Sequence, residues 1–176
     1  MKIKYIILAI IFLFFMTGCE GEITGIVVDA ETGQPIEGAV ILVEWTTQHG
    51  FGLTYTESYK VVEVVTDKNG KASIEGVSSP FVGTPRVTIY KQGYIAWNNE
   101  FIFPDWKKRT DFKWENNYVF KLEKFKPQYS YAKHISFIRE AHNFGMASEE
   151  KQLIRKAYEW ERQKAIEEKR EGRKDK

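Results

Sequence analysis

The chain has 176 residues, 43% of them hydrophobic, with 26 Lys and Arg against 24 Asp and Glu and a single cysteine. This length allows one domain with a hydrophobic core and a smaller appendage. The near-balanced charge excludes the strongly basic surface typical of general nucleic-acid binding, so no nucleic-acid partner is expected. One cysteine cannot form an internal disulfide, so the apolar core must stabilise the fold by itself.

Residues 1–18 have the pattern of a secretory signal peptide. Lys2 and Lys4 precede an apolar run from Tyr5 to Phe15, which is shorter than the about 20 apolar residues that cross a bilayer. We therefore expect this segment to direct export and to be removed.

The run Met16-Thr17-Gly18-Cys19 resembles the bacterial lipobox, although Met16 stands where Leu is usual. In that motif a diacylglyceryl group is attached to the cysteine sulfur and the chain is cut before the cysteine. We predict that Cys19 is the lipidation site, that residues 19–21 form a lipidated N-terminus carrying acyl chains such as palmitate, and that the membrane is a partner. Glu20, in place of Asp, favours the outer over the inner membrane. The alternative is an ordinary secretory signal with a chance cysteine.

Residues 22–126 are predicted to form a seven-stranded β-sandwich, because short apolar strands alternate with turn residues. The expected strands are Ile23–Val28, Ala39–Trp45, Tyr59–Thr66, Lys71–Glu75, Arg86–Lys91, Ile95–Glu100 and Asn117–Phe125. Ala39–Trp45 is apolar on both faces, which is typical of a central strand. The polar segment Thr46–Ser58 is expected to be a loop. Asp67-Lys68-Asn69-Gly70 predicts a hairpin that pairs the strands on either side of it.

Residues 127–176 are predicted to form a helical extension, so the fold class is mainly β with two C-terminal α-helices. Apolar residues recur at helical spacing over Ser130–Phe144, and Ser148 can cap a second helix. The charged segment from Glu167 to Lys176 is expected to be a frayed, solvated tail. The sequence leaves open whether these helices pack on the sandwich or on a partner.

Three segments resemble the carboxypeptidase regulatory-like domain over about residues 22–125. The run from Glu22 to Ile41 reads EITGIVVDAETGQPIEGAVI, Thr66–Gly70 matches a later turn, and Lys91-Gln92-Gly93-Tyr94 matches a Lys-x-Gly-Tyr turn. The resemblance implies a prealbumin-like sandwich, which is usually non-catalytic and is grouped with carbohydrate-binding-like folds. It assigns no functional residues.

Enzymatic activity is not expected, and neither is a metal or another cofactor. None of His49, His134 and His142 has the Glu three residues later that the zinc motif of metallocarboxypeptidases requires. His134 and His142 are interpreted as helix-face or packing residues. Asp67–Gly70 has a faint likeness to a calcium loop, but a turn accounts for it. The basic triplet Lys107-Lys108-Arg109 fits either a solvated loop or a contact with phosphate headgroups or acidic glycans.

Two functions remain open. The first is a non-enzymatic, membrane-anchored envelope lipoprotein that acts as a binding or scaffolding module for an envelope protein or polysaccharide. The alternative is a surface carbohydrate-binding module in which Trp97, Trp106 and Trp114 stack on sugar faces. That alternative requires the three rings to be exposed on one side. The competing interpretation is that the rings close one end of the sandwich core.

Overall fold

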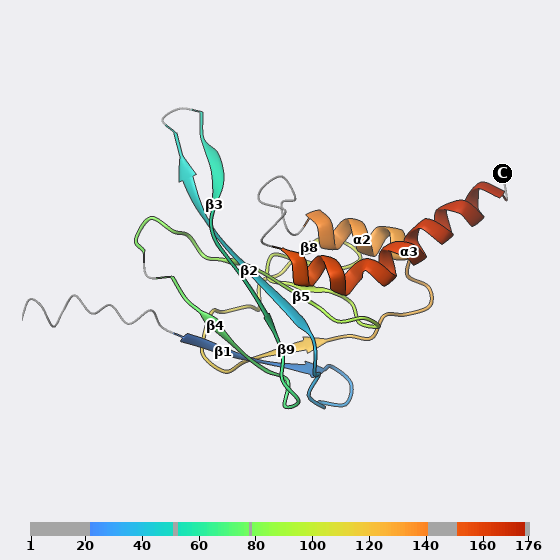
Figure 1. Cartoon of the computed structure of the whole chain (residues 1–176), viewed down its shortest axis with the longest axis horizontal. Helices are drawn as coiled ribbons and strands as arrows, with labels where there is room; N and C mark the ends of the chain where they lie inside the picture. Colours follow the sequence, from blue (N-terminus) through green and yellow to red (C-terminus); the bar gives the residue numbers. More distant parts are fainter. Residues whose placement is uncertain (1–21, 51–52, 78, 141–150, 175–176) are drawn as a thin grey trace, which may run out of the picture.

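The computed structural model describes residues 22–50, 53–77, 79–140 and 151–174, which form two stacked sheets and two helices (Figure 1). The first sheet has the order β4-β1-β9 and consists of β1 (Glu22–Asp29), β4 (Lys71–Glu75) and β9 (Tyr118–Leu122). The central strand β1 pairs antiparallel with β4 and parallel with β9. The final strand of the sandwich therefore lies beside the first.

The second sheet has the order β3-β2-β5-β6. Its strands are β2 (Val40–His49), β3 (Tyr55–Val65), β5 (Arg86–Tyr90) and β6 (Trp97–Asn98). A separate two-stranded sheet joins β7 (Phe101–Ile102) to β8 (Lys107–Lys108). The two main sheets confirm the predicted seven-stranded sandwich, although Ile95–Glu100 contributes only the two residues of β6 as a strand.

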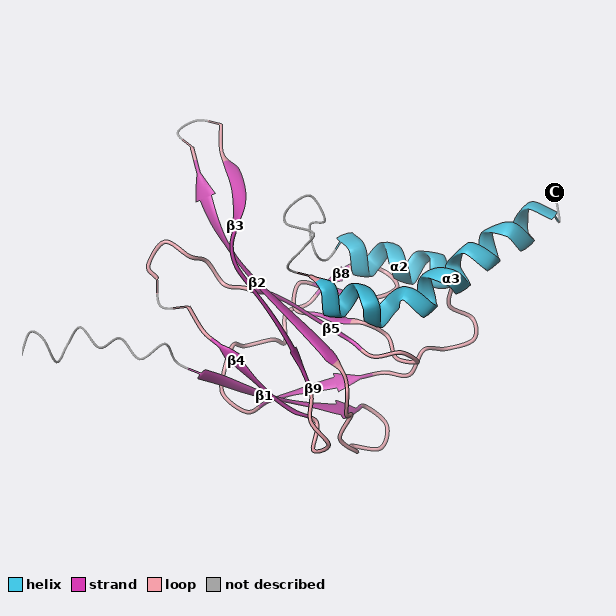
Figure 2. Ribbon diagram, in the orientation of Figure 1, coloured by secondary structure: helices cyan, strands magenta, loops and turns pink. Residues whose placement is uncertain are grey.

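Two hydrophobic cores lie on opposite faces of β2. Ile41, Val43 and Trp45 pack between the sheets, whereas Val40 and Leu42 pack under α2 (Tyr131–Glu140) and α3 (Gln152–Lys174). The molecule therefore has three layers, with the four-stranded sheet in the middle (Figure 2). This arrangement explains why β2 is apolar on both faces, and it shows that the helices pack on the sandwich.

The turn Asp67–Gly70 does not form the predicted hairpin. Its two flanking strands belong to different sheets, since β3 pairs with β2 and β4 pairs with β1. The Asp67 carboxylate accepts the backbone N–H groups of Asn69 and Lys71, each at 2.8 Å. Gly70 has a φ of 70°. These local bonds make the turn tight, but they do not determine which sheet receives the next strand.

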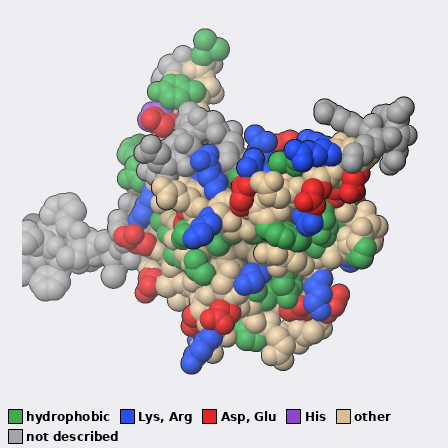
Figure 3. All heavy atoms as spheres, turned by 45° about the vertical axis from the view of Figure 1, so that its right-hand side comes forward, with side chains coloured by type: hydrophobic (Ala, Val, Ile, Leu, Met, Phe, Trp, Pro, Cys, Tyr) green, Lys and Arg blue, Asp and Glu red, His purple; other side chains and the backbone are tan. Residues whose placement is uncertain are grey.

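The segment Thr46–Ser58 is not the predicted loop either. The pairing of β2 with β3 continues out to His49 opposite Tyr55, after a register shift between Trp45 and Thr46. The result is a two-stranded ribbon that projects from the body (Figures 1 and 3). Because this ribbon covers no core, its strands lack the alternation of apolar and polar residues by which strands are recognised in a sequence.

The helices also differ from the prediction. α3 continues to Lys174, and Glu168 within the predicted frayed tail binds the first turn of α2, where it accepts the N–H groups of Tyr131 at 2.8 Å and Ala132 at 3.0 Å. The end of the first predicted helix, with His142, and the expected cap Ser148 fall outside the described residues. No helix in the described part of the chain combines the length and apolarity needed to cross a bilayer.

Candidate functional site

Buried polar groups attach the helices to the four-stranded sheet. Glu44 and Tyr90 come from the sheet. His134 belongs to α2, Lys151 is the residue before α3, and Glu161 belongs to α3. We call these five residues the helix–sheet seam. Each is at most 4% exposed. Their burial is costly unless every polar atom is paired, so the seam must be held in one geometry.

Glu161 is the centre of the first half of the seam. Its carboxylate accepts the Tyr90 hydroxyl at 2.7 Å and binds Nδ1 of His134. Nε2 of His134 accepts the backbone N–H of Ala96 at 2.8 Å, so the ring proton lies on Nδ1 and the imidazole is neutral. Burial, followed by the charge of Glu161, raises the pKa of Tyr90 far above its usual value. The tyrosine therefore remains a hydrogen-bond donor.

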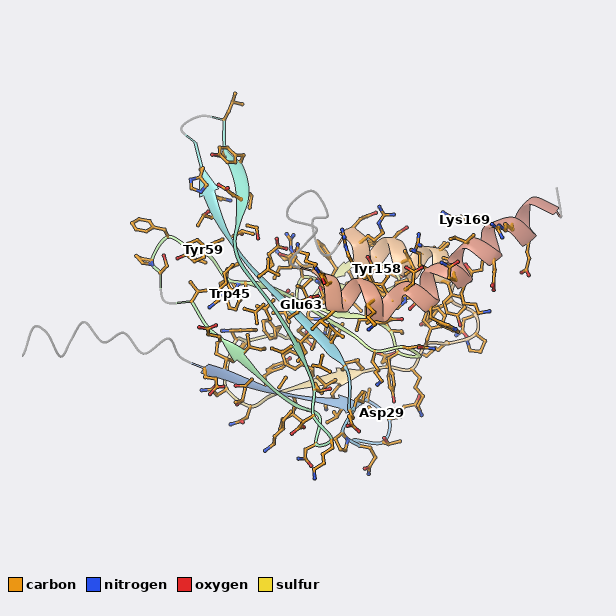
Figure 4. The ribbon with its side chains drawn as sticks, viewed as in Figure 1. Asp29, Trp45, Tyr59, Glu63, Tyr158 and Lys169 are labelled. Atoms are coloured by element: carbon orange, nitrogen blue, oxygen red, sulfur yellow. The ribbon has the colours of Figure 1, made fainter. Side chains whose placement is uncertain are left out.

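A buried ion pair forms the other half of the seam. Nζ of Lys151 lies 2.9 Å from Oε2 of Glu44 on β2. Nearby, the carboxylate of Glu63 on β3 accepts the N–H groups of Leu153 at 2.8 Å and Ile154 at 2.9 Å, which caps the start of α3 (Figure 4). The sheet thus supplies the charges that fix where α3 begins and how it lies.

A pocket with a volume of about 540 Å³ opens beside Glu161. Aromatic rings form much of its wall: Phe125 and Tyr131 stack with centroids 4.7 Å apart, and Trp160 meets Tyr131 edge-on at 5.7 Å. Trp160 is 42% exposed. Flat apolar rings next to the exposed side chain of Gln92 can bind a ligand that has both an apolar face and hydrogen-bonding groups.

A second polar cluster lies at the far end of β1, around Asp29 (Figure 4). Its carboxylate accepts the N–H groups of Glu31 and Thr32, each at 2.9 Å, and the Tyr94 hydroxyl at 3.0 Å. The Thr32 bond is the largest reason that the pKa of Asp29 is lowered to about 2. Lys124 lies 3.6 Å from the same carboxylate, and this charge raises the pKa of the lysine.

The structure does not bring the three predicted tryptophans together on one exposed surface. Trp97 is 6% exposed and lies in the core between the sheets, and Trp114 packs against the same core through Phe112. Trp106 is 37% exposed and lies instead against Phe137 of α2. Trp97 is therefore a core residue, as the competing interpretation held.

The basic triplet Lys107-Lys108-Arg109 divides into one residue with structural contacts and two exposed residues. Arg109 stacks over the Trp97 ring at 4.6 Å and donates to the carbonyl of Asn98 at 2.7 Å, whereas Lys107 and Lys108 are exposed on β8. Within the described residues, no three His, Cys, Asp or Glu side chains are placed to share a metal ion. The lipidation site Cys19 falls outside the described part of the chain.

Sequence reasoning missed Glu161. His134, expected to be a helix-face or packing residue, is indeed buried among aromatic rings, but its hydrogen bonds to Ala96 and Glu161 were not expected. A signal for Glu161 was present, because Ile154, Tyr158, Glu161 and Ala165 share one helical stripe. A carboxylate within an apolar stripe indicates a buried partner.

Comparison with known proteins gives a family match and several distant structural likenesses. A family model of the carboxypeptidase regulatory-like domain matches residues 22–112, and no curated protein matches the chain. The group B streptococcus pilus 2b backbone protein is 20% identical, with a TM-score of 0.37, over 60% of this chain and 41% of that chain. The shaft pilin SpaA of Lactobacillus rhamnosus GG is 18% identical, with a TM-score of 0.36, over 60% and 46%. A streptococcal ancillary pilin is 18% identical, with a TM-score of 0.32, over 61% and 30%. This chain spans less than half the length of each pilin.

Proposed function

Since this chain belongs to the carboxypeptidase regulatory-like domain family, we propose that it is a non-enzymatic binding or scaffolding module of the cell envelope, held at a membrane by lipid on Cys19. The observation that carries the proposal is the helix–sheet seam. Its buried ionisable groups are each bonded to a partner in the neighbouring layer or helix. They therefore serve to hold the layers together, and the three-layer body can present its surfaces without rearrangement.

The proposed anchor is supported by its position in the sequence. Only Glu20 and Gly21 separate Cys19 from the first residue of β1. Acyl chains on that cysteine would anchor the body firmly, because each buried methylene contributes about 0.8 kcal/mol. The anchor would place the protein in the cell envelope, at the outer membrane rather than the inner one because Glu20 follows the cysteine.

Expression of Cys19→Ser in the native host tests the anchor. We expect the variant to lack the acyl mass of the wild-type chain and to accumulate as an uncut precursor. Mass spectrometry of the purified chains and fractionation of the membranes measure both effects. Unchanged acyl mass and unchanged membrane retention would refute lipidation at this position.

Carbohydrate binding in the pocket that opens beside Glu161 is a second candidate function. The favouring observation is that Trp160, Tyr131 and Phe125 line a pocket together with the polar side chain of Gln92. Ring faces next to hydrogen-bonding groups suit a sugar, which has apolar faces and hydroxyl edges. The ligand would be an envelope polysaccharide.

Titration with a panel of envelope polysaccharides, followed by tryptophan fluorescence, tests this candidate. A saturable change that Trp160→Ala abolishes and Trp106→Ala preserves would support it, because Trp106 is exposed to a similar extent but lies outside the pocket. A flat response across the panel would contradict it. Repeating the titration with Cys19→Ser shows whether polysaccharide binding is independent of the lipid anchor.

A further inference from the structure

One end of the molecule carries an unusual concentration of exposed apolar side chains. Among the described residues, the four most exposed large hydrophobic side chains are Leu53 at 93%, Phe81 at 84%, Tyr55 at 59% and Tyr59 at 55%. Three of them belong to the β2–β3 ribbon, and Phe81 belongs to the loop between β4 and β5. Exposed apolar side chains that gather on one side of a molecule mark a candidate contact with a membrane or with another protein.

The same end holds the start of β1. Figure 1 shows the ribbon, the loop between β4 and β5, and the beginning of β1 along one side of the molecule, away from the helices. A shallow pocket provides independent evidence, because Glu22, Trp45 and Val82 line it together. Trp45 marks the base of the ribbon. The start of β1, the ribbon base and the loop are therefore neighbours.

The proposed lipid anchor fixes how far this end can lie from a membrane. From Cys19 to Glu22 the chain advances three residues, which cover at most about 10 Å when fully extended. A tether this short holds the exposed side chains at an effective concentration in the millimolar range, so even weak insertion into lipid is populated.

We propose that this end is a membrane-docking surface, with Leu53, Phe81, Tyr55 and Tyr59 in the interfacial layer of the bilayer that holds the anchor. The proposal rests on the lipidation of Cys19 in the proposed function. Aromatic side chains favour this layer, because they have an apolar ring and, in tyrosine, a polar tip.

Basic side chains near this surface lie beside carboxylates. His49 lies 3.6 Å from Glu57, and Lys60 lies 3.2 Å from Glu75. The contact therefore depends on apolar insertion rather than on attraction to anionic headgroups, and it should form on zwitterionic lipid and persist at high salt.

Site-specific fluorescence on the full, lipidated protein in phosphatidylcholine vesicles tests the proposal. Because Cys19 is the only cysteine and is acylated, Leu53→Cys and Phe81→Cys each offer one thiol for an environment-sensitive dye. Lys169→Cys is the matched control, on the exposed surface of α3 far from this end (Figure 4). We expect lipids with brominated acyl chains to quench the dyes at 53 and 81 several-fold more than the dye at 169, both at low and at high salt.

Two results would overturn the docking surface, and they differ in what they say about the anchor. If the protein floats with the vesicles but all three dyes are quenched equally weakly, the anchor stands and this orientation is wrong. If the wild-type chain does not float with the vesicles, the anchor fails and the docking surface fails with it.

Discussion

The hydroxyl of Tyr94 donates a hydrogen bond of 3.0 Å to Oδ2 of Asp29, 65 positions earlier in the chain. Asp29 ends the first strand, and Tyr94 closes the Lys-x-Gly-Tyr turn that precedes β6. The bond therefore joins two of the segments that carry the family resemblance, and it connects the first sheet to the second. Both residues therefore have a structural role, which is to hold the two sheets of the sandwich together.

Asp29 should make the folded state sensitive to acid. Its folded pKa of about 2 lies below its ordinary value of 3.8. Its contribution to stability is therefore complete above pH 3.8 and is lost as the pH falls from 3.8 to about 2. Asp29→Asn keeps an acceptor for Thr32 but loses the charge, so we expect lower stability at pH 7 and a difference that shrinks towards pH 2.

Urea unfolding at a series of pH values measures this effect, with Asp105→Asn as the control at an exposed carboxylate. Asp105→Asn should leave the pH dependence of the free energy of unfolding unchanged. If the difference in free energy of unfolding between wild type and Asp29→Asn stays constant down to pH 2, Asp29 is not the acid-sensitive group.

Glu161→Ala should destabilise the protein strongly. The variant leaves the Tyr90 hydroxyl and the His134 ring buried without their acceptor, and each unsatisfied donor costs about 1–3 kcal/mol. Glu159→Ala is the matched control on the same helix. Its exposed ion pair with Arg162, at 2.8 Å, contributes about 0–1 kcal/mol. Equal losses of the free energy of unfolding for the two variants would show that the seam is not a stabilising network.

Gly33 and Gly70 have the same backbone conformation but different surroundings. Substituting each by Ala therefore distinguishes the cost of a positive φ from the cost of a steric clash. Gly33 and Gly70 have φ values of 71° and 70°. A Cβ at Gly33 meets no atom within 4 Å, whereas one at Gly70 would lie 2.4 Å from the carbonyl oxygen of Val27. Gly33→Ala should therefore cost only the strain of a positive φ, about 1 kcal/mol, and Gly70→Ala distinctly more.

Chemical denaturation of both variants gives the comparison. Because their φ strain is matched, the difference between the two losses reports the collision with β1. Equal losses would mean that β1 moves away from residue 70 without cost.

Removal of the helices should prevent the sandwich from folding cooperatively. A chain that ends at Lys126 exposes Val40, Leu42 and Tyr90, which are buried in the second core. It also uncovers Glu44 on the same face and removes its partner Lys151. Circular dichroism during heating, with light scattering to detect aggregation, measures the result. A soluble, cooperatively unfolding product would show that the helices are dispensable for the sandwich.

Much of this fold could be predicted because strand periodicity is a local signal. β2 shows it best: alternate residues on both faces are apolar, which predicted two buried faces before the position of the helices was known. The alternation in β9 is equally local, since Phe120 and Leu122 share one face of the strand and both are buried. Each of these inferences needed only the residues of one strand.

The errors arise where the outcome depends on distant partners. Asp67–Gly70 has the residues of a tight turn in either topology, and pairing with β1 decides that β4 joins the other sheet. Glu161 and His134 lie 27 positions apart on different helices. No spacing rule links two residues on different helices, so the seam became visible only when the helices were placed.

The parallel pairing of β9 with β1 has a consequence for the order in which the chain folds. β1 acquires its second neighbour only when Tyr118–Leu122 is available. Glu44 likewise forms its ion pair only with a lysine 107 positions later. Contacts that span so much sequence slow folding, because the intervening loop must close first. The first sheet and the buried ion pair are therefore completed only when the last third of the chain is available. A polypeptide that remains loosely folded until it is nearly complete can still be threaded, extended, through a narrow translocation channel.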